Sequence, residues 1–164
     1  MNRIAITALT SEAFAPFGEV GAPLADGGHA AGDVALDLSR GMPRFYIMRL
    51  AQRGLVFDVM ARHDRVTQCL GAVDGEPWLM AVAPAYIAQP GLADIRAFCI
   101  PPGCFIKLGL GTWHAGPYFT EPAQLLQPRN DRHQHRRLHR LAAERRGGVR
   151  HVKHKIDQSR RVAR

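Results

Sequence analysis

The chain has few cysteines and lacks long hydrophobic runs. Its three cysteines, Cys69, Cys99 and Cys104, form no C-x-x-C pair, which argues against a disulfide framework and against a structural zinc site. We interpret them as buried or half-buried thiols. No run approaches the roughly 20 apolar residues of a membrane span, and the early stretch IAIT is too short for the core of a signal peptide. We therefore expect a cytoplasmic protein.

Aromatic residues are missing from the last quarter of the chain, and acidic residues are scarce there. All 12 aromatic residues lie at or before Phe119. Residues 1–122 contain 9 Lys and Arg against 11 Asp and Glu, whereas residues 123–164 contain 13 against 3, so the net charge of +8 belongs to the C-terminal part. Such a segment cannot offset its ordering entropy by burial, and alone it should be disordered or frayed. We divide the chain into one domain, 1–122, and a basic tail, 123–164.

Short apolar or alternating segments recur through the domain, with turn signals such as VDGEP, AQPG and PPG between them. This rhythm predicts an all-β sandwich or barrel. Only residues 11–18 read as helical, with Ser11 as the cap, and residues 21–40 read as a connection. The predicted strands are 44–50, 55–61, 67–73, 78–85, 95–100, 104–110 and 112–119.

The first candidate for chemistry is the stretch MARHDRVTQ, which contains Arg62, His63 and Gln68. His63 ends one predicted strand and Gln68 opens the next. Because side chains alternate along a strand, His63 should share a face with Phe57, Val59 and Ala61 and point inward.

The second candidate is the stretch FIKLGLGTWHAGP. Lys107 shares a face with Phe105, and Trp113 and His114 point to opposite faces after a glycine-rich turn. A lysine among apolar strand residues and a histidine beyond such a turn suit a barrel mouth that holds a small carboxylate. We expect His63, His114 and Lys107 to converge in one pocket, lined by Trp113 or Phe105.

A tightly bound metal is not expected. Before the tail the chain has only three histidines, His29, His63 and His114, and His29 falls in a predicted loop. Barrel metal sites normally need three or four convergent His, Glu or Asp ligands, and Gln68 is a weak ligand. A divalent metal at His63, Gln68 and His114 remains the alternative.

Four stretches follow in order: LTSEAFAPFGEV, MARHDRVTQ, LADIRAF and TWHAGP. Together they resemble the ureidoglycolate lyase family, whose pattern is F-x-x-[FY]-G-[DE]-V, then E-R-H-x4-Q, L-R-A-F and [GV]-x-W-H-H-P. The resemblance covers about residues 9–119. It implies a cupin-like (RmlC-like) β-barrel, usually a homodimer, that cleaves ureidoglycolate to glyoxylate and urea in allantoin and purine catabolism. Ala61 and Ala115 depart from the pattern, so the chain resembles a divergent branch.

The chemistry of that reaction suits the two candidate stretches. Ureidoglycolate is a carbinolamide with a carboxylate, so its cleavage needs a base, an acid and a cation. His63 and His114 can supply the base and the acid, in an order that the sequence leaves open. Lys107 or Arg62 would bind the carboxylate and Gln68 the ureido group, with Trp113 also at the substrate.

Other features of the sequence suggest three alternative functions. A small-carboxylate-binding cupin without turnover stays open. Nucleic-acid binding would rest on the basic tail, which lacks the scaffold or aromatic platforms of such modules. A metal-binding tail would rest on His133, His135 and His139, but the neighbouring arginines repel a cation.

The tail does not match the family, which continues after its W-H motif with something close to FYNLELxDTNVVD. This chain instead has LLQPRNDRHQHRRL. Shifting the reading of Leu125 to His139 by one nucleotide permits Phe-Tyr-Asn-Leu-Glu, two variable positions and then Asp-Thr-Asn-Thr-Val-Asp. We hypothesise a frameshift, natural or from sequencing, between about Gly116 and Leu125, which would leave an unpaired sheet edge.

Overall fold

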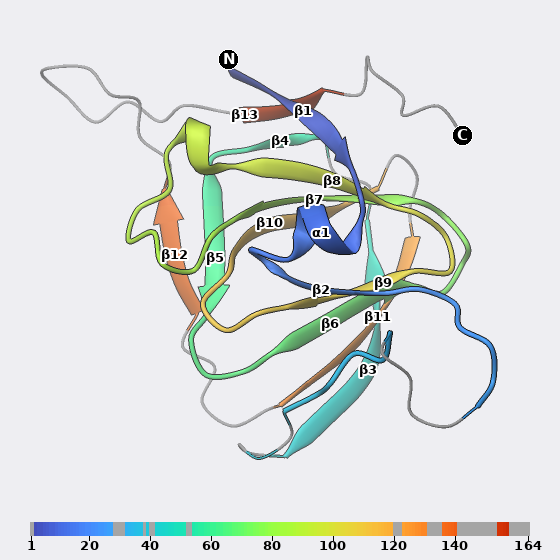
Figure 1. Ribbon diagram of the computed structural model, residues 1–164. Helices are drawn as coiled ribbons and strands as arrows, with labels where there is room; N and C mark the ends of the chain where they lie inside the picture. The colour runs from blue at the N-terminus through green and yellow to red at the C-terminus, as the bar shows by residue number, and fades with distance from the viewer. Residues whose placement is uncertain are drawn as a thin grey trace, which may run out of the picture.

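The computed structural model describes residues 2–27, 32–37, 39, 42–51, 54–119, 123–130, 136–140 and 154–157. Within these ranges the protein is nearly all-β, as predicted (Figure 1). No helix in this described part is long and apolar enough to cross a membrane. The elements are β1 (Asn2–Ala8), α1 (Ser11–Phe14), β2 (Gly18–Gly21), β3 (Pro43–Leu50), β4 (Val56–Phe57), β5 (Val59–His63), β6 (Gln68–Ala72), β7 (Trp78–Ala83), η1 (Leu92–Asp94), β8 (Arg96–Ile100), β9 (Phe105–Leu108), β10 (Trp113–Tyr118), β11 (Ala123–Asn130), β12 (Arg136–Arg140) and β13 (His154–Asp157).

The strands of the described ranges form two sheets. The large sheet has the order β12-β5-β10-β7-β8-β1-β13-β4, and the small sheet has the order β2-β9-β6-β11-β3. Only Asp58 separates β4 from β5, although these strands lie near opposite ends of the large sheet. The large sheet is therefore nearly closed on itself, and the protein is a cupin-like β-barrel.

The predicted strands are confirmed with one break, which falls at Asp58. Phe57 and Met60 belong to the same hydrophobic cluster, although alternation in one unbroken strand would place them on opposite faces. The bend between β4 and β5 shifts the alternation by one residue. The expectation that His63 shares a face with Phe57 is therefore wrong, because the two residues lie on different sides of this bend.

The N-terminal region differs more from prediction. The helix ends at Phe14 rather than near residue 18, and its N-cap is Thr10, whose side chain accepts a hydrogen bond from the Ala13 N–H at 3.0 Å. Strand β1 and strand β2 were not predicted. Pairing of β2 with β9 requires glycine at position 18, because a Cβ there would lie 1.8 Å from the Lys107 carbonyl oxygen.

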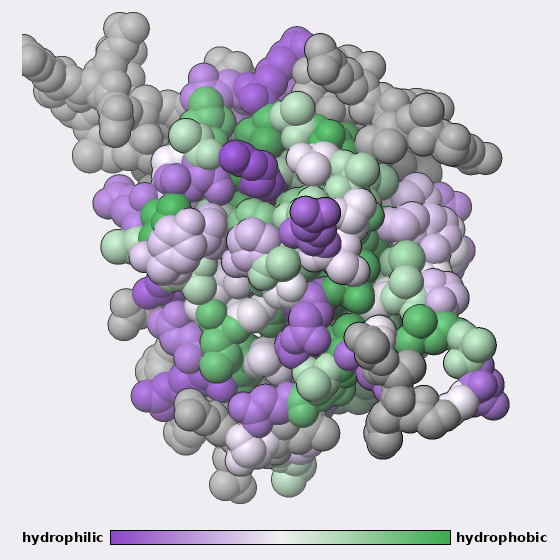
Figure 2. All heavy atoms as spheres, in the orientation of Figure 1, coloured by the Kyte–Doolittle hydropathy of each residue, from purple (hydrophilic) through white to green (hydrophobic). Residues whose placement is uncertain are grey.

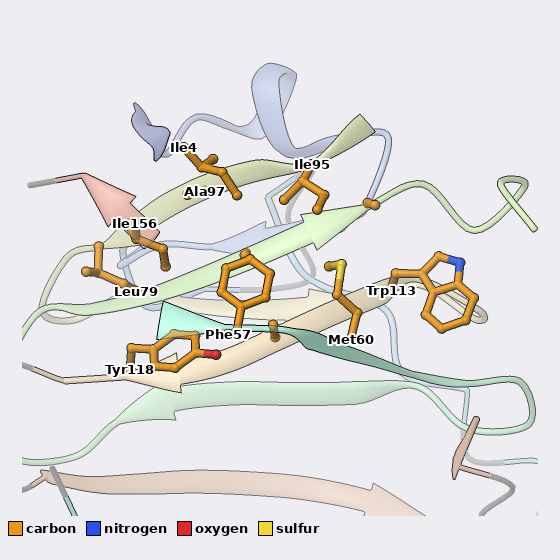
Figure 3. Packing of buried hydrophobic residues seen from close by; sticks show 12 residues of the cluster. Ile4, Phe57, Met60, Leu79, Ile95, Ala97, Trp113, Tyr118 and Ile156 are labelled. Carbon is orange, nitrogen blue, oxygen red and sulfur yellow. The ribbon is translucent and has the colours of Figure 1, made fainter. Parts of the chain in front are cut away.

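Two hydrophobic clusters lie on opposite faces of β7. One is made only by the large sheet and the segment before β8, and we call it the large-sheet core (Figure 3). The other draws residues from both sheets and α1, and we call it the inter-sheet core. Trp78, Met80 and Val82 face the inter-sheet core, whereas Leu79 and Ala81 face the large-sheet core. A residue of the large sheet therefore faces the small sheet if its partner in the neighbouring strand belongs to the inter-sheet core, and faces away from it if that partner belongs to the large-sheet core.

The surface mixes hydrophobic and hydrophilic residues over the face drawn in Figure 2. Several exposed large apolar side chains of the described residues lie on and next to β3, the edge strand of the small sheet. Phe45 is 67% exposed and Ile47 is 56% exposed. Because both point away from the barrel, they leave an apolar strip on this edge.

Three stretches of the basic tail are strands. β11 lies between β3 and β6, β12 pairs with β5, and β13 lies between β1 and β4. Each of these stretches pairs with strands of the first 122 residues. The remaining tail residues lie outside the described ranges, so the division into a domain and a frayed or frameshifted tail stays a prediction.

Candidate active site

Two chain crossings between the sheets meet at one end of the barrel. Residues 64–67 lead from β5 to β6, and residues 109–112 lead from β9 to β10. The Gly111 N–H donates a hydrogen bond to the His63 carbonyl at 2.8 Å, which ties the second crossing to the end of β5. Gly111 has φ +76°, a conformation that favours glycine. The last residue of β5 is thereby held beside the start of β10.

The same crossing is also tied to the N-terminal region. The Gly109 N–H and the Thr112 hydroxyl both donate to the Phe17 carbonyl, each at 2.9 Å. Phe17 packs in the inter-sheet core beside Phe14 and Phe98. The turn before β10 therefore rests on a rigid aromatic cluster, which limits how far the residues that follow it can move.

His63 and His114 converge on the face between the sheets. His114 pairs in register with Ala61 of β5 and with Val82 of β7, and Val82 belongs to the inter-sheet core. Residues opposite one another in antiparallel strands share a face, so His114 points between the sheets. The His63 and His114 ring centroids are 5.2 Å apart, with their planes 33° apart. The predicted convergence of these two histidines is confirmed.

The protonation of His114 follows from its neighbour. Its Nδ1 lies 3.2 Å from the Thr112 carbonyl oxygen, and the side chain is only 9% exposed. A carbonyl only accepts hydrogen bonds, so this contact requires a proton on Nδ1. The neutral ring then carries its lone pair on Nε2, which is the form that a general base needs.

Gln68 faces the same space from the small sheet. It pairs in register with Leu108, which is in the inter-sheet core, and its side chain is only 8% exposed. The Gln68 Oε1 atom is buried and has no hydrogen-bond partner within the described part of the chain. A buried acceptor without a partner is costly, so a ligand N–H would bind it favourably.

Arg62 and Trp113 lie on the other face of the large sheet. The Arg62 guanidinium carbon is 4.7 Å from the centre of the Trp113 ring, and Arg62 Nε is 3.1 Å from the Asp64 carboxylate. Trp113 is 3% exposed in the large-sheet core, and its indole N–H donates to the Ile87 carbonyl at 2.8 Å. The expectation that Trp113 lines a pocket with His114 is therefore wrong, because strand alternation separates them.

Lys107 is also remote from the histidine pair. Its two neighbours in β9 face the inter-sheet core, so Lys107 points to the outer face of the small sheet with Phe105, which is 37% exposed. Its ammonium donates to the Glu19 carboxylate and, at 2.5 Å, to the Ala35 carbonyl. The expectation that Lys107 and Phe105 share the pocket of His63 and His114 is therefore wrong.

A pocket of about 540 Å³ opens beside His114, along the seam between β5 and β10. The sequence prediction missed two of its polar residues, Asp58 and Tyr118. A charged residue inside the apolar run LVFDVMA is the signal that could have identified Asp58. The described lining residues are Gly54, Val56, Phe57, Asp58, Val59, Ala61, His114, Ala115, Gly116 and Tyr118.

The thiols of Cys69 and Cys99 are poor nucleophiles. Cys69 is buried, and its burial raises the pKa of the thiol to about 11, with the nearby Lys107 charge opposing that rise. Burial also raises the pKa of Cys99, and Cys104 is half-buried. The interpretation of all three as buried or half-buried thiols is confirmed, and Cys69 and Cys99 stay protonated near neutral pH.

The potential metal ligands are few. The described residues include no group of three or more His, Cys, Asp or Glu side chains that could hold a metal ion. His63, His114 and Gln68 offer two imidazoles and one amide, and an amide is a weak ligand for transition metals.

Comparison with known proteins identifies one family. A sequence model described as ureidoglycolate lyase matches residues 1–125. No curated protein sequence matches the chain significantly. The matched part includes both candidate stretches and ends close to the start of the basic tail.

Proposed function

The chain belongs to the ureidoglycolate lyase family, whose model covers 125 of its 164 residues, and on this premise we propose that it cleaves ureidoglycolate to glyoxylate and urea. The observation that carries the proposal is the close pair of His63 and His114 at the end of the barrel. The pocket beside His114 has room for a molecule of this size, since its volume is about 540 Å³. His63 and Gln68 are not among its described lining residues, and in this proposal they act from the side of His114 that faces between the sheets.

The reaction needs two proton transfers at neighbouring atoms. A base removes the proton of the carbinol hydroxyl, the C=O bond of glyoxylate forms, and the bond from that carbon to the ureido nitrogen breaks. An acid delivers a proton to the departing nitrogen, which completes urea. Because the hydroxyl and the nitrogen are bound to the same carbon, the base and the acid must lie close together. Two imidazole rings 5.2 Å apart meet this requirement.

Our assignment makes His114 the base and His63 the acid. The contact of His114 Nδ1 with the Thr112 carbonyl favours a lone pair on Nε2, which supports the role of a base. His63 in its protonated form would deliver the second proton and offset the charge of the substrate carboxylate. Gln68 would accept a hydrogen bond from a substrate N–H through its buried Oε1.

Arg62, Lys107 and Trp113 have different roles in this proposal from those expected from the sequence. None of the described residues that line the pocket is a lysine or an arginine. Arg62 on Trp113 would brace the strand that ends in His63, and Lys107 would hold the connection after β2 against the small sheet. These residues would therefore support the site without touching the substrate.

The test is release of glyoxylate from ureidoglycolate by the full chain, followed with a coupled dehydrogenase. Turnover above the spontaneous decay of the substrate is the expected result. Saturable binding of glyoxylate without any turnover would instead favour a small-carboxylate-binding cupin. Salt-sensitive binding of DNA that is lost when residues 123–164 are deleted would favour the nucleic-acid reading.

We also propose that the protein acts as a cytoplasmic homodimer in allantoin catabolism, as the family resemblance implies. The apolar strip formed by Phe45 and Ile47 on edge strand β3 supports a contact between copies. Light scattering coupled to gel filtration should give twice the mass of 18.1 kDa. A monomer at micromolar concentration would contradict this part of the proposal.

A further inference from the structure

We propose that Asp58 selects the substrate by accepting hydrogen bonds from the N–H groups of its ureido end. This inference rests on the proposed function, because it deepens the description of the same pocket. It assigns a substrate class: small carboxylates whose opposite end is uncharged and rich in N–H donors.

The position of Asp58 is set by the bend between β4 and β5. Phe57, on one side, belongs to the large-sheet core, and both Phe57 and Val59, on the other side, line the pocket. Asp58 lines the same pocket as His114. An acidic residue is therefore present in a pocket wall where an unbroken apolar strand would offer only apolar residues.

The Asp58 carboxylate can accept hydrogen bonds from a ligand. Its side chain is half-buried, and no hydrogen bond or ion pair joins it to any other residue that the structure describes. An ionised carboxylate has about four acceptor sites on its two oxygens and no donor. Partial burial without a partner is unfavourable for a charge, so a ligand that brings N–H donors would gain stronger hydrogen bonds than it makes in water.

The charge of Asp58 also orients the ligand. It is the only Asp, Glu, Lys or Arg among the described lining residues. A substrate carboxylate would be repelled by Asp58, whereas an uncharged ureido group would be attracted through its N–H groups. The ureido end would then lie at Asp58 and the carboxylate away from it, with the reacting carbon between them near His114. A single aspartate would thus provide both selectivity and orientation.

Two inert ligands that differ only at the recognised end would test this. N-carbamoylglycine keeps the ureido group and the carboxylate but lacks the carbinol hydroxyl, so it cannot undergo the cleavage. N-acetylglycine replaces its terminal amino group by a methyl group. Their dissociation constants would be measured by calorimetry on the full chain and on Asp58→Ala, Asp58→Asn and the control Asp74→Asn, a change in an exposed turn.

We expect the unaltered chain and Asp74→Asn to bind N-carbamoylglycine about 10-fold more tightly than N-acetylglycine, the ratio expected for a hydrogen bond to a charged group. Asp58→Ala should remove this preference, because the terminal amino group that distinguishes the two ligands then meets no carboxylate. Asp58→Asn keeps the shape and one acceptor oxygen, so it should give an intermediate ratio and show that the effect does not come from misfolding.

Three results would overturn the inference: equal affinities in the unaltered chain, no binding of either ligand, or an unchanged ratio in Asp58→Ala and Asp58→Asn. These readouts do not depend on turnover. A chain that prefers N-carbamoylglycine through Asp58 but releases no glyoxylate would refute the lyase proposal alone. A chain that releases glyoxylate but shows no such preference would refute only the role of Asp58.

Discussion

The imidazole rings of His63 and His114 lie with their centroids 5.2 Å apart, although 50 residues separate them in the chain. One ends β5 and the other is the second residue of β10. The hydrogen bond from the Gly111 N–H to the His63 carbonyl holds the two strands in this position. The pair is therefore a property of the backbone scaffold, which makes it suitable for reactions that need fixed geometry.

Replacement of either histidine should reduce turnover by roughly 10²- to 10⁴-fold, the usual contribution of a general acid or base. For His114 the informative change is His114→Asn, whose amide can still donate to the Thr112 carbonyl but has no basic nitrogen. Steady-state kinetics and thermal melting would be measured together. Because the two rings act in one reaction, the double variant should lose less than the product of the single losses. Normal turnover in His114→Asn would assign His114 to structure.

Lys107→Met should lower stability and leave substrate affinity unchanged. The substitution removes the ammonium that binds Glu19 and the Ala35 carbonyl, and we expect a loss of about 1 kcal/mol in the free energy of unfolding. Denaturant titration and KM would be compared with Glu19→Gln, which weakens the same ion pair. A rise in KM of tenfold or more at unchanged stability would instead indicate that Lys107 binds the substrate.

The free energy of unfolding should decrease at alkaline pH because of Cys69. Its pKa is raised from 9.0 to about 11, so the folded chain holds the proton more tightly than the unfolded chain does. The resulting stability is fully present below pH 9 and is lost as the pH rises from about 9 toward 11, with a total on the order of 2 kcal/mol. Unfolding titrations at pH 8, 9.5 and 10.5 would show it. A similar decline in Cys69→Ala would contradict this origin.

Chelation should leave activity unchanged. The candidate site offers two imidazoles and an amide, which form a poor ligand set without a carboxylate or a third imidazole. Glyoxylate release after dialysis against EDTA should equal that of the untreated protein. Added zinc should inhibit, since it would occupy the lone pair of the base. Loss of turnover on chelation, restored by a divalent metal, would establish the alternative of a metal at His63, Gln68 and His114.

Resequencing of the gene should reveal a frame change between about Gly116 and Leu125. The family match ends at residue 125, within the region where the sequence pattern breaks. Strand β11 is paired on both sides, yet it contains Pro128, and proline is rare inside central strands because it has no N–H to donate. A chain with the frame restored should be more soluble and more active. An in-frame tail whose removal abolishes turnover would contradict the hypothesis.

Alternation and turn signals were sufficient to predict most of the architecture from the sequence. The strands from β3 to β10 appeared as apolar segments between glycine and proline turns, and the two candidate stretches marked the crossings where His63 and His114 meet. The unequal charge of residues 1–122 and 123–164 separated the family-like part from the tail. Strand β2 escaped prediction because a four-residue edge segment has little periodicity. Strand β1 lies between β8 and β13, and its pairing with strands so distant in the sequence is not visible in local periodicity.

The tertiary structure decided which residues share the site. Alternation predicts that Trp113 and His114 point to opposite faces of the sheet. Only the packing of the small sheet against the large one shows that His114 is on the face between the two sheets. The same packing turns Lys107 outward to Glu19. The bend at Asp58 changes the alternation between β4 and β5, which no periodicity within a single segment can show. Local sequence determines the period of a strand, whereas its direction toward the core depends on contacts with distant strands, because burial is a property of the assembled sheets.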